Sequence, residues 1–263
     1  MAPGRNPWGF SRSIEEMDIL SALQRIEEVQ NLKLLFAIES GSRAYEFHSV
    51  NSDYDIRGIY VYPFKRYLNL DKPEEQLSEM VGDHDFVLWD LRKALLLLSE
   101  SNPSLLDWLS SPIVYREEPG FRDSLIELAK EYYSPEKYFN ANFGLAKKHY
   151  LRYIEECRQV ESKVYLYTLR ALAACRYVLR ESFAPPISRD FQDEYPNHKV
   201  IIEKLISNKK AGEETQLRDY DSRLDDLIRN ELNELEKERH SFTPVKRDLA
   251  SATKFFLDHV LKA

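Results

Sequence analysis

The stretch FAIESGSRAYEFHSVNSDYDIRGIYVY, residues 36–62, joins two apolar runs through a glycine turn and two aspartates. The first run stops at Gly41-Ser42, and the second opens directly after Asp53 and Asp55. Side chains alternate along a strand, so two residues that are two apart share one face. The two carboxylates are therefore expected to point the same way at the mouth of the second strand.

Two unpaired carboxylates at this separation repel each other, and each raises the pKa of the other. A divalent cation relieves the repulsion, and magnesium is commonly held by one or two carboxylates together with substrate phosphates. Asp53 and Asp55 are thus candidate ligands of Mg²⁺ or Mn²⁺. The alternative is a pair of solvated aspartates that only begin a strand.

The glycine turn before this pair favours the metal interpretation. A glycine turn that leads into a helix exposes backbone N–H groups, which suit a phosphate. The Ser42 hydroxyl and the Arg43 guanidinium add donors beside Gly41. A phosphate cradle followed by a carboxylate pair supplies the two parts that phosphoryl or nucleotidyl transfer requires.

A third carboxylate is expected in the segment DHDFVLWDL, because a two-metal site needs a further acidic ligand. Asp85 enters the apolar run as a strand residue and is the best candidate. Asp90 is expected to cap the helix that follows, and Asp83 is expected to lie in the turn.

With these residues in place, the chain resembles the nucleotidyltransferase superfamily of DNA polymerase β type. It is most similar to predicted nucleotidyltransferases linked to RNA repair, through blocks similar to ESGSRAYEF…SDYDIRGIYV, WDLRKAL…SNPSLLDWLSSPIVY and KVYLYTLRALAACRY…PP. The blocks run in order from Glu39 to Pro186. Glu46 stands where that family usually has glycine.

The resemblance implies an α+β fold, a polymerase β-like mixed sheet with flanking helices followed by an all-helical domain. It also implies an NTP substrate and two Mg²⁺ or Mn²⁺ ions. Carried over by position, Gly41 and Ser42 would hold the triphosphate. The metal ligands would be Asp53, Asp55 and Asp85, which also form the catalytic acid triad.

Lys163, Tyr167 and Arg170 are further candidates for nucleotide binding. They lie at i, i+4 and i+7 on one helical face, where two cations and an aromatic ring suit a triphosphate and a base. The alternative is an ordinary amphipathic helix with tyrosines in the core and cations at its edge.

The periodicity predicts a mixed α/β unit over residues 12–120 and a helical domain over residues 121–263. The first unit reads as a helix over 13–30 that starts with the capping box Ser13 and Glu16, then strands at 32–39 and 52–62. An irregular connection over 68–80, a strand over 83–91, two helices and a strand at 113–117 follow. All later segments fit helical periods.

Composition limits the partners. The 37 Lys and Arg residues against 44 Asp and Glu residues give a net charge of −7, which does not favour a basic nucleic-acid binder. No apolar run is long enough to span a membrane, so we expect a cytoplasmic protein. The acceptor is expected to be an RNA or tRNA end, held by the cationic segments 147–153, 176–180 and 207–210. Nucleotidylation (AMPylation) of a protein or small molecule, and an inactive nucleotide-binding scaffold, remain alternatives.

Overall fold

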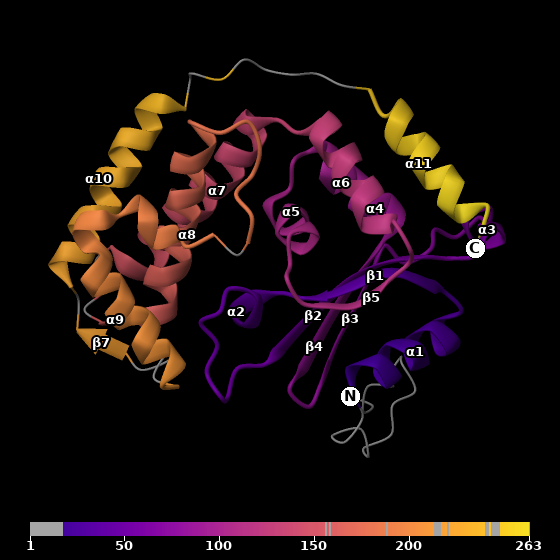
Figure 1. Cartoon of the computed structure of the whole chain (residues 1–263), viewed down its shortest axis with the longest axis horizontal. Coiled ribbons are helices and arrows are strands. Elements are labelled where there is room, and N and C mark those ends of the chain that lie inside the picture. The colour runs from indigo at the N-terminus through magenta and orange to yellow at the C-terminus, as the bar shows by residue number, and fades with distance from the viewer. Residues whose placement is uncertain are drawn as a thin grey trace.

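The computed structural model describes residues 18–155, 157, 159–187, 189–212, 217–219, 221–239, 242 and 248–262. A five-stranded sheet with the order β3-β4-β2-β1-β5 lies at its centre (Figure 1). Its strands are β1 (Lys33–Glu39), β2 (Tyr54–Val61), β3 (Gln76–Val81), β4 (His84–Asp90) and β5 (Val114–Glu117). β2 and β4 are parallel, whereas the other neighbouring pairs are antiparallel. The expected mixed sheet is confirmed.

Both faces of the sheet are covered, as the continuous apolar run of β1 predicts. One face packs against α1 (Ile19–Gln30) through a cluster that includes Leu23 and Ile56. The other face packs against α4 (Leu91–Ser99), α5 (Pro103–Leu109) and α6 (Phe121–Tyr132) through a larger cluster that includes Ile59. Alternation along β2 therefore turns Asp55, like Ile59, toward the larger cluster.

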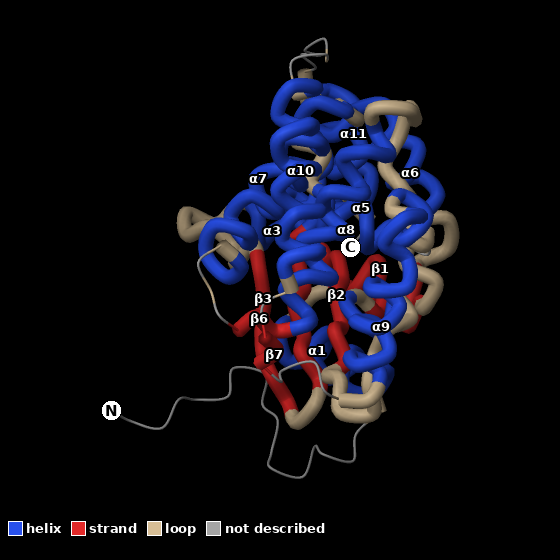
Figure 2. The backbone as a smooth tube through the Cα atoms, turned by 90° about the vertical axis from the view of Figure 1, so that its left-hand side faces the viewer, coloured by secondary structure: helices blue, strands red, loops and turns tan. Residues whose placement is uncertain are grey.

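The second half of the chain is helical, as expected (Figure 2). Its longer helices are α7 (Pro135–His149), α8 (Ser162–Val178), α9 (Lys199–Lys210), α10 (Ser222–Glu238) and α11 (Ala250–Val260). Its short elements are the π-helical turn η2 (Tyr150–Ile154) and the 3₁₀ turns η3 (Phe191–Glu194) and η4 (Pro196–His198). Helices α7 to α10 gather on one side of the sheet, whereas α11 returns beside α4 at the other end (Figure 1).

The larger core cluster joins buried residues of the sheet to buried residues of α7, α8 and α10. The division of the chain near residue 120 into two domains stays a prediction. No described helix has the length and apolar character needed to cross a bilayer.

Three local predictions need correction. The first helix begins at Ile19, because Asp18 is extended and its carboxylate accepts the N–H of Ser21 as an N-cap; Ser13 and Glu16 lie outside the described residues. The expected irregular connection over 68–80 overlaps β3, which pairs with β4 across the two-residue turn Gly82-Asp83; the alternating polar and apolar residues of β3 resemble a polar connection. The helical half also contains two short paired strands, β6 (Gln159–Glu161) and β7 (Leu217–Asp219).

The smaller predictions for this region hold. The short helix α2 (Gly41–Ala44) follows β1, as expected. A further short helix, α3 (Phe64–Tyr67), follows β2 and was not predicted. Asp90 caps α4 by accepting the backbone N–H of Arg92, and Asp83 lies in the turn before β4. The strand predicted at 113–117 is β5.

Candidate functional site

The glycine turn lies directly against one of the predicted acids. Gly41 has φ +58°, a left-handed conformation that glycine adopts without steric cost. A Cβ atom at this position would lie 1.9 Å from Asp55 Oδ2. The turn is also tied to β2, because the N–H of Ser40 donates to the carbonyl of Asp55 at 2.8 Å. Glycine is therefore required here both by the backbone conformation and by the approach of the carboxylate.

Asp55 and Asp85 are brought together by strand pairing. They are register partners on the parallel strands β2 and β4. One guanidinium joins them, since Arg57 Nη2 lies 2.6 Å from Asp55 Oδ1 and 2.7 Å from Asp85 Oδ2. Burial raises the pKa of Asp55, and the repulsion from Asp85 acts in the same direction, while Arg57 opposes it. Arg57 was not among the predicted site residues, although its place two residues after Asp55 puts it on the same face.

Asp53 lies one residue before β2 and is exposed. It is near enough to Asp55 to contribute to the raised pKa of that carboxyl. Within the described part of the chain, however, no three His, Cys, Asp or Glu side chains form a group arranged to hold a metal ion. The expected triad is thus present as a tight pair with Asp53 beside it.

The carboxylate pair fits a divalent cation by its chemistry. A single positive charge between Asp55 and Asp85 can contact both carboxylates. Their side chains are 28% and 35% exposed, so solvent and ions can reach them. Carboxylate oxygens are the ligands that a hard ion such as Mg²⁺ takes. The Arg57 guanidinium holds that position here, so a metal at the pair competes with an internal cation.

A buried acid behind the pair fixes its backbone. Glu39, at the end of β1, is fully buried, and its Oε1 accepts the N–H of Asp55 at 2.9 Å. Its other oxygen accepts the hydroxyl of Tyr115 from β5. Burial raises the pKa of Glu39. Glu39 was not predicted as a site residue, because a lone acid at the end of an apolar strand has no distinctive spacing.

The two other cradle residues lie at the same turn. Ser42 is buried, 6% exposed, in the first turn of α2. Arg43 binds the loop that carries Asp53, with Nη2 2.8 Å from the carbonyl of Ser52 and Nε 3.3 Å from that of Asp53. Its guanidinium also lies 3.7 Å from the ring centre of Tyr54. Arg43 is therefore engaged in holding the loop.

The three candidates on α8 take different places. Arg170 is bound by Asp107 of α5 at 3.2 Å and lies 3.9 Å from the ring centre of Tyr45. Lys163 forms an ion pair with Glu161 at 2.9 Å. Tyr167 contacts the ring of Phe47 edge-on, with 6.2 Å between centroids. Tyr167 and Arg170 therefore both contact the segment that follows the cradle, and Arg170 also joins α8 to α5.

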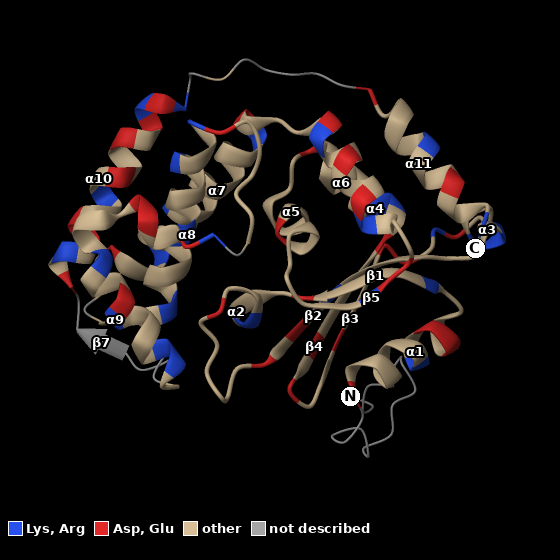
Figure 3. Cartoon of the chain, in the orientation of Figure 1, with Lys and Arg blue, Asp and Glu red and all other residues tan. Residues whose placement is uncertain are grey.

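A buried lysine from α9 faces the acids. Lys209 is only 4% exposed, and its positive charge lowers the pKa of Asp55. Its Nζ lies 5.7 Å from the ring centre of Phe47 and 6.0 Å from that of Tyr167. Figure 3 shows basic residues at the lower end of α9 across from the acidic ends of β2 and β4. Residues 207–210 were predicted only as part of an RNA-binding surface, because helical periodicity does not show which lysine turns inward.

Comparison with known proteins adds three findings. Residues 16–258 match the RNA repair pathway DNA polymerase beta family. The uncharacterized protein YcgL of Bacillus subtilis (strain 168) is 33% identical over 240 residues, which cover 89% of this chain and 91% of YcgL. A solved structure of a nucleotidyltransferase-like protein from Exiguobacterium sibiricum 255-15 aligns with 94% of this chain and 81% of its own, at 12% identity and a TM-score of 0.33.

Proposed function

Because the chain belongs to the RNA repair pathway DNA polymerase beta family, we propose that it is a metal-dependent nucleotidyltransferase that transfers NMP from an NTP to an acceptor hydroxyl or phosphate. The observation that carries the proposal is the pairing of Asp55 with Asp85 beside Gly41. A carboxylate pair at a glycine turn places a cation site next to a phosphate cradle.

The buried charge of Lys209 supports the triphosphate part of the proposal. Burying an ammonium group is costly unless an opposite charge accompanies it. Lys209 faces Asp55 across the site, where an NTP would bring further negative charge. We assign the triphosphate to Gly41, Ser42 and Lys209.

The metal ions would be Mg²⁺ or Mn²⁺, held by Asp53, Asp55 and Asp85, and would neutralise charge on the phosphates in the transition state. Asp85 is more exposed than Asp55. We therefore assign Asp85 to orient the acceptor hydroxyl and to take up its proton. Arg57 would keep the two carboxylates in register and balance their charge before the substrate binds. Glu39 would hold the backbone of Asp55 in place.

The proposed acceptor is an RNA end, with tRNA as the first choice. The cationic segments predicted to bind RNA differ in whether their charges are free to contact a phosphate. Lys148, in the last turn of α7, is exposed and has no ion-pair partner among the described residues, so it is open to a phosphate. In segment 207–210, Lys209 is assigned to the triphosphate and Lys210 lines a pocket with Phe47. Arg176 and Arg180, in contrast, are bound by Glu231 and Glu194. We therefore propose that RNA phosphates follow segment 147–153 and bypass 176–180 and 207–210.

The test is the incorporation of each labelled NTP into total RNA with Mg²⁺ or Mn²⁺, for the wild type and for Asp53→Ala/Asp55→Ala. We expect label in RNA with the wild type and at least a hundredfold less with the variant, because each of its two substitutions removes a carboxylate that would hold a metal ion. Label found only in protein or in a small molecule would favour the AMPylation alternative. Equal incorporation by both proteins would refute the assignment.

A further inference from the structure

Glu46 adopts a backbone conformation that glutamate rarely takes. Its φ is +61°, one of three positive values among the described non-glycine residues, with Asn31 and Ser101. Such a conformation is strained for a residue with a side chain, and it persists at places where the surrounding structure or a function requires it. The Glu46 side chain is exposed and lies two residues after the cradle helix α2.

Glu46 lines a pocket of about 190 Å³ between the segment after α2 and the helical half. Pockets for drug-sized ligands have volumes of about 300–1,000 Å³, so this one suits a single ring system. Three aromatic side chains contribute to its wall: Tyr45, Phe47 and Phe191. The rings of Tyr45 and Phe47 are stacked at 5.3 Å, and such apolar faces suit a flat base.

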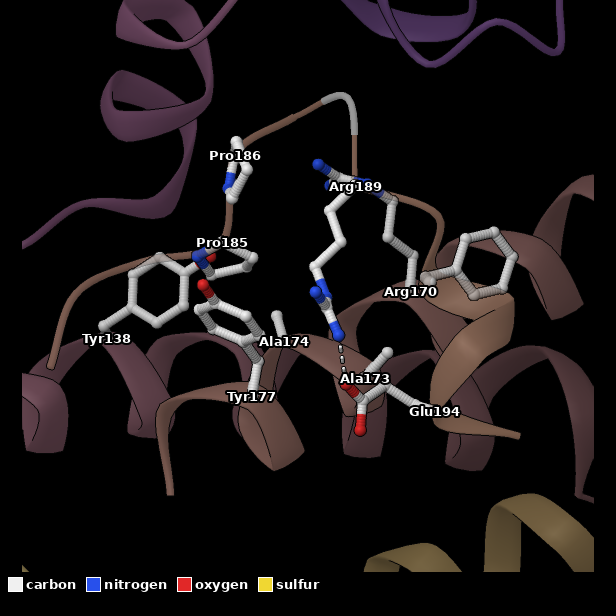
Figure 4. Close-up of a pocket in the computed structure, with 10 residues that line it drawn as sticks. Tyr138, Arg170, Ala173, Ala174, Tyr177, Pro185, Pro186, Arg189 and Glu194 are labelled. Atoms are coloured by element: carbon white, nitrogen blue, oxygen red, sulfur yellow. Dashed lines mark hydrogen bonds and ion pairs between the residues drawn. The ribbon is translucent and has the colours of Figure 1, made fainter. Parts of the chain in front are cut away.

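Several charged groups of the pocket are already engaged. Arg170 is bound by Asp107, as described above. Arg189 reaches Glu194 at 3.2 Å, and Figure 4 shows this pair at the adjoining pocket, which Arg170 also lines. Asp190 accepts Nε2 of Gln192 at 3.0 Å.

Three groups remain available. The carboxylate of Glu46 and the ammonium of Lys210 have no partner within the described ranges. Gln192 is 8% exposed, and its buried Oε1 accepts no hydrogen bond from any described residue. A buried amide oxygen without a donor is costly, so it indicates a ligand that brings one. The pocket thus offers three acceptor oxygens and one cationic donor.

We propose that this pocket binds the base of the incoming nucleotide and selects guanine. The inference rests on the proposed function and names its substrate. Guanine presents two adjacent donors, N1–H and the 2-amino group, and one carboxylate can accept both. Its O6 and N7 atoms accept from lysine. Adenine, cytosine and uracil lack two donor nitrogens side by side, so none uses both oxygens of Glu46 in this way.

The pocket adjoins the triphosphate site. Phe47 lines the pocket and also lies 5.7 Å from Nζ of Lys209, which faces Asp55. Lys209 and Lys210 are consecutive in α9. Lys209 is assigned to the triphosphate and Lys210 to the base. One nucleoside triphosphate can therefore place its base in the pocket and its phosphates at Ser42, with Phe47 between the two sites.

The test measures binding of α,β-methylene analogues of GTP, ITP and ATP with Mg²⁺, because these analogues cannot release pyrophosphate. ITP lacks the 2-amino group and keeps O6. For the wild type we expect the GTP analogue to bind about tenfold to a hundredfold tighter than the ITP analogue, the range for a hydrogen bond to a charged group. Glu46→Gly is expected to abolish that ratio while raising the melting temperature, because glycine relieves the positive φ. Lys210→Met is expected to weaken both analogues alike.

Asn31→Gly serves as the matched control, since it also places glycine at a positive φ but lies at the end of α1. It should leave all affinities unchanged. Equal binding of the GTP and ITP analogues to the wild type, or an unchanged ratio in Glu46→Gly, would overturn the guanine pocket while leaving the transferase proposal intact. Failure of every triphosphate to bind would overturn both.

Discussion

The acidic and the basic sides of the site are built by different means. Asp55 and Asp85 are adjacent because β2 and β4 pair in parallel, and the aspartate pattern already predicted that they would converge. Lys209 faces them from α9, and nothing in its local sequence distinguishes it from Lys210. The contrast shows that a site built on strand register is readable in a sequence, whereas one that depends on helix packing is not.

Gly41→Ala tests the acidic side and has the largest expected effect. The new Cβ would displace the Asp55 carboxylate, so we expect transfer activity to fall about a hundredfold or more, the effect of misplacing a reacting group by about 1 Å. Gly120→Ala is the matched control, because its φ is +74° but no atom lies within 4 Å of the added Cβ. Both variants should lose about 1–2 kcal/mol of unfolding free energy from the positive φ, and Gly41→Ala should lose more because of the clash with Asp55. Equal activities of the two would contradict the role of the glycine turn.

Asp107→Ala tests whether Arg170 joins α8 to α5. The substitution leaves a largely buried guanidinium without its partner, and we expect the free energy of unfolding to fall by about 2 kcal/mol, less than for a fully buried pair. Urea unfolding measures the change. The double variant Asp107→Ala/Arg170→Met should recover part of the loss, because the stranded charge is gone. No recovery would show that Arg170 stabilises the fold through another contact, such as the ring of Tyr45.

Lys209→Met tests the basic side. Removing the buried ammonium should raise the KM for the NTP about tenfold, as expected for a lost hydrogen bond to a charged group. Lys204→Met, at an exposed position on the same helix, provides the control and should leave KM unchanged. An unchanged KM in Lys209→Met would remove this lysine from the site.

The smallest expected effect is on how the free energy of unfolding depends on pH, and it differs between Asp90 at the end of β4 and His149 at the end of α7. Burial raises the pKa of Asp90, so its contribution to stability is full below the ordinary value of 3.8 and is lost as the pH rises through the raised pKa. Burial lowers the pKa of His149, so its contribution is present above 6.5 and is lost as the pH falls through the lowered pKa. Asp90→Asn and His149→Gln should each remove one of these two pH-dependent slopes in the free energy of unfolding. Urea unfolding between pH 4 and 8 measures both, and unchanged slopes would contradict the burial of these groups.

The sequence predicted most of the helices and strands that have a regular pattern of apolar residues, and fewer of the contacts that form between separate elements. Continuous apolar runs and helical periods located β1, β2, β4 and the later helices. β3 was missed, because its alternating residues resemble a polar connection until β4 pairs with it.

The same limit applies at the candidate site. Gly41, Ser42, Asp55 and Asp85 fall together as expected from their local pattern. Arg57 was overlooked as a partner of both acids, and Arg170 pairs with Asp107, sixty-three positions away. Such pairings depend on the approach of separate elements, which residue spacing within one element cannot report.

The central claim is that Asp53, Asp55 and Asp85 hold a divalent ion together with the triphosphate. Its most direct test is the electron paramagnetic resonance of Mn²⁺ titrated into the protein with a non-cleavable NTP analogue. We predict that the wild type binds Mn²⁺ with the analogue at least tenfold tighter than Asp55→Asn, because that substitution removes the charge shared with Asp85. Equal Mn²⁺ binding by the two proteins would contradict the account.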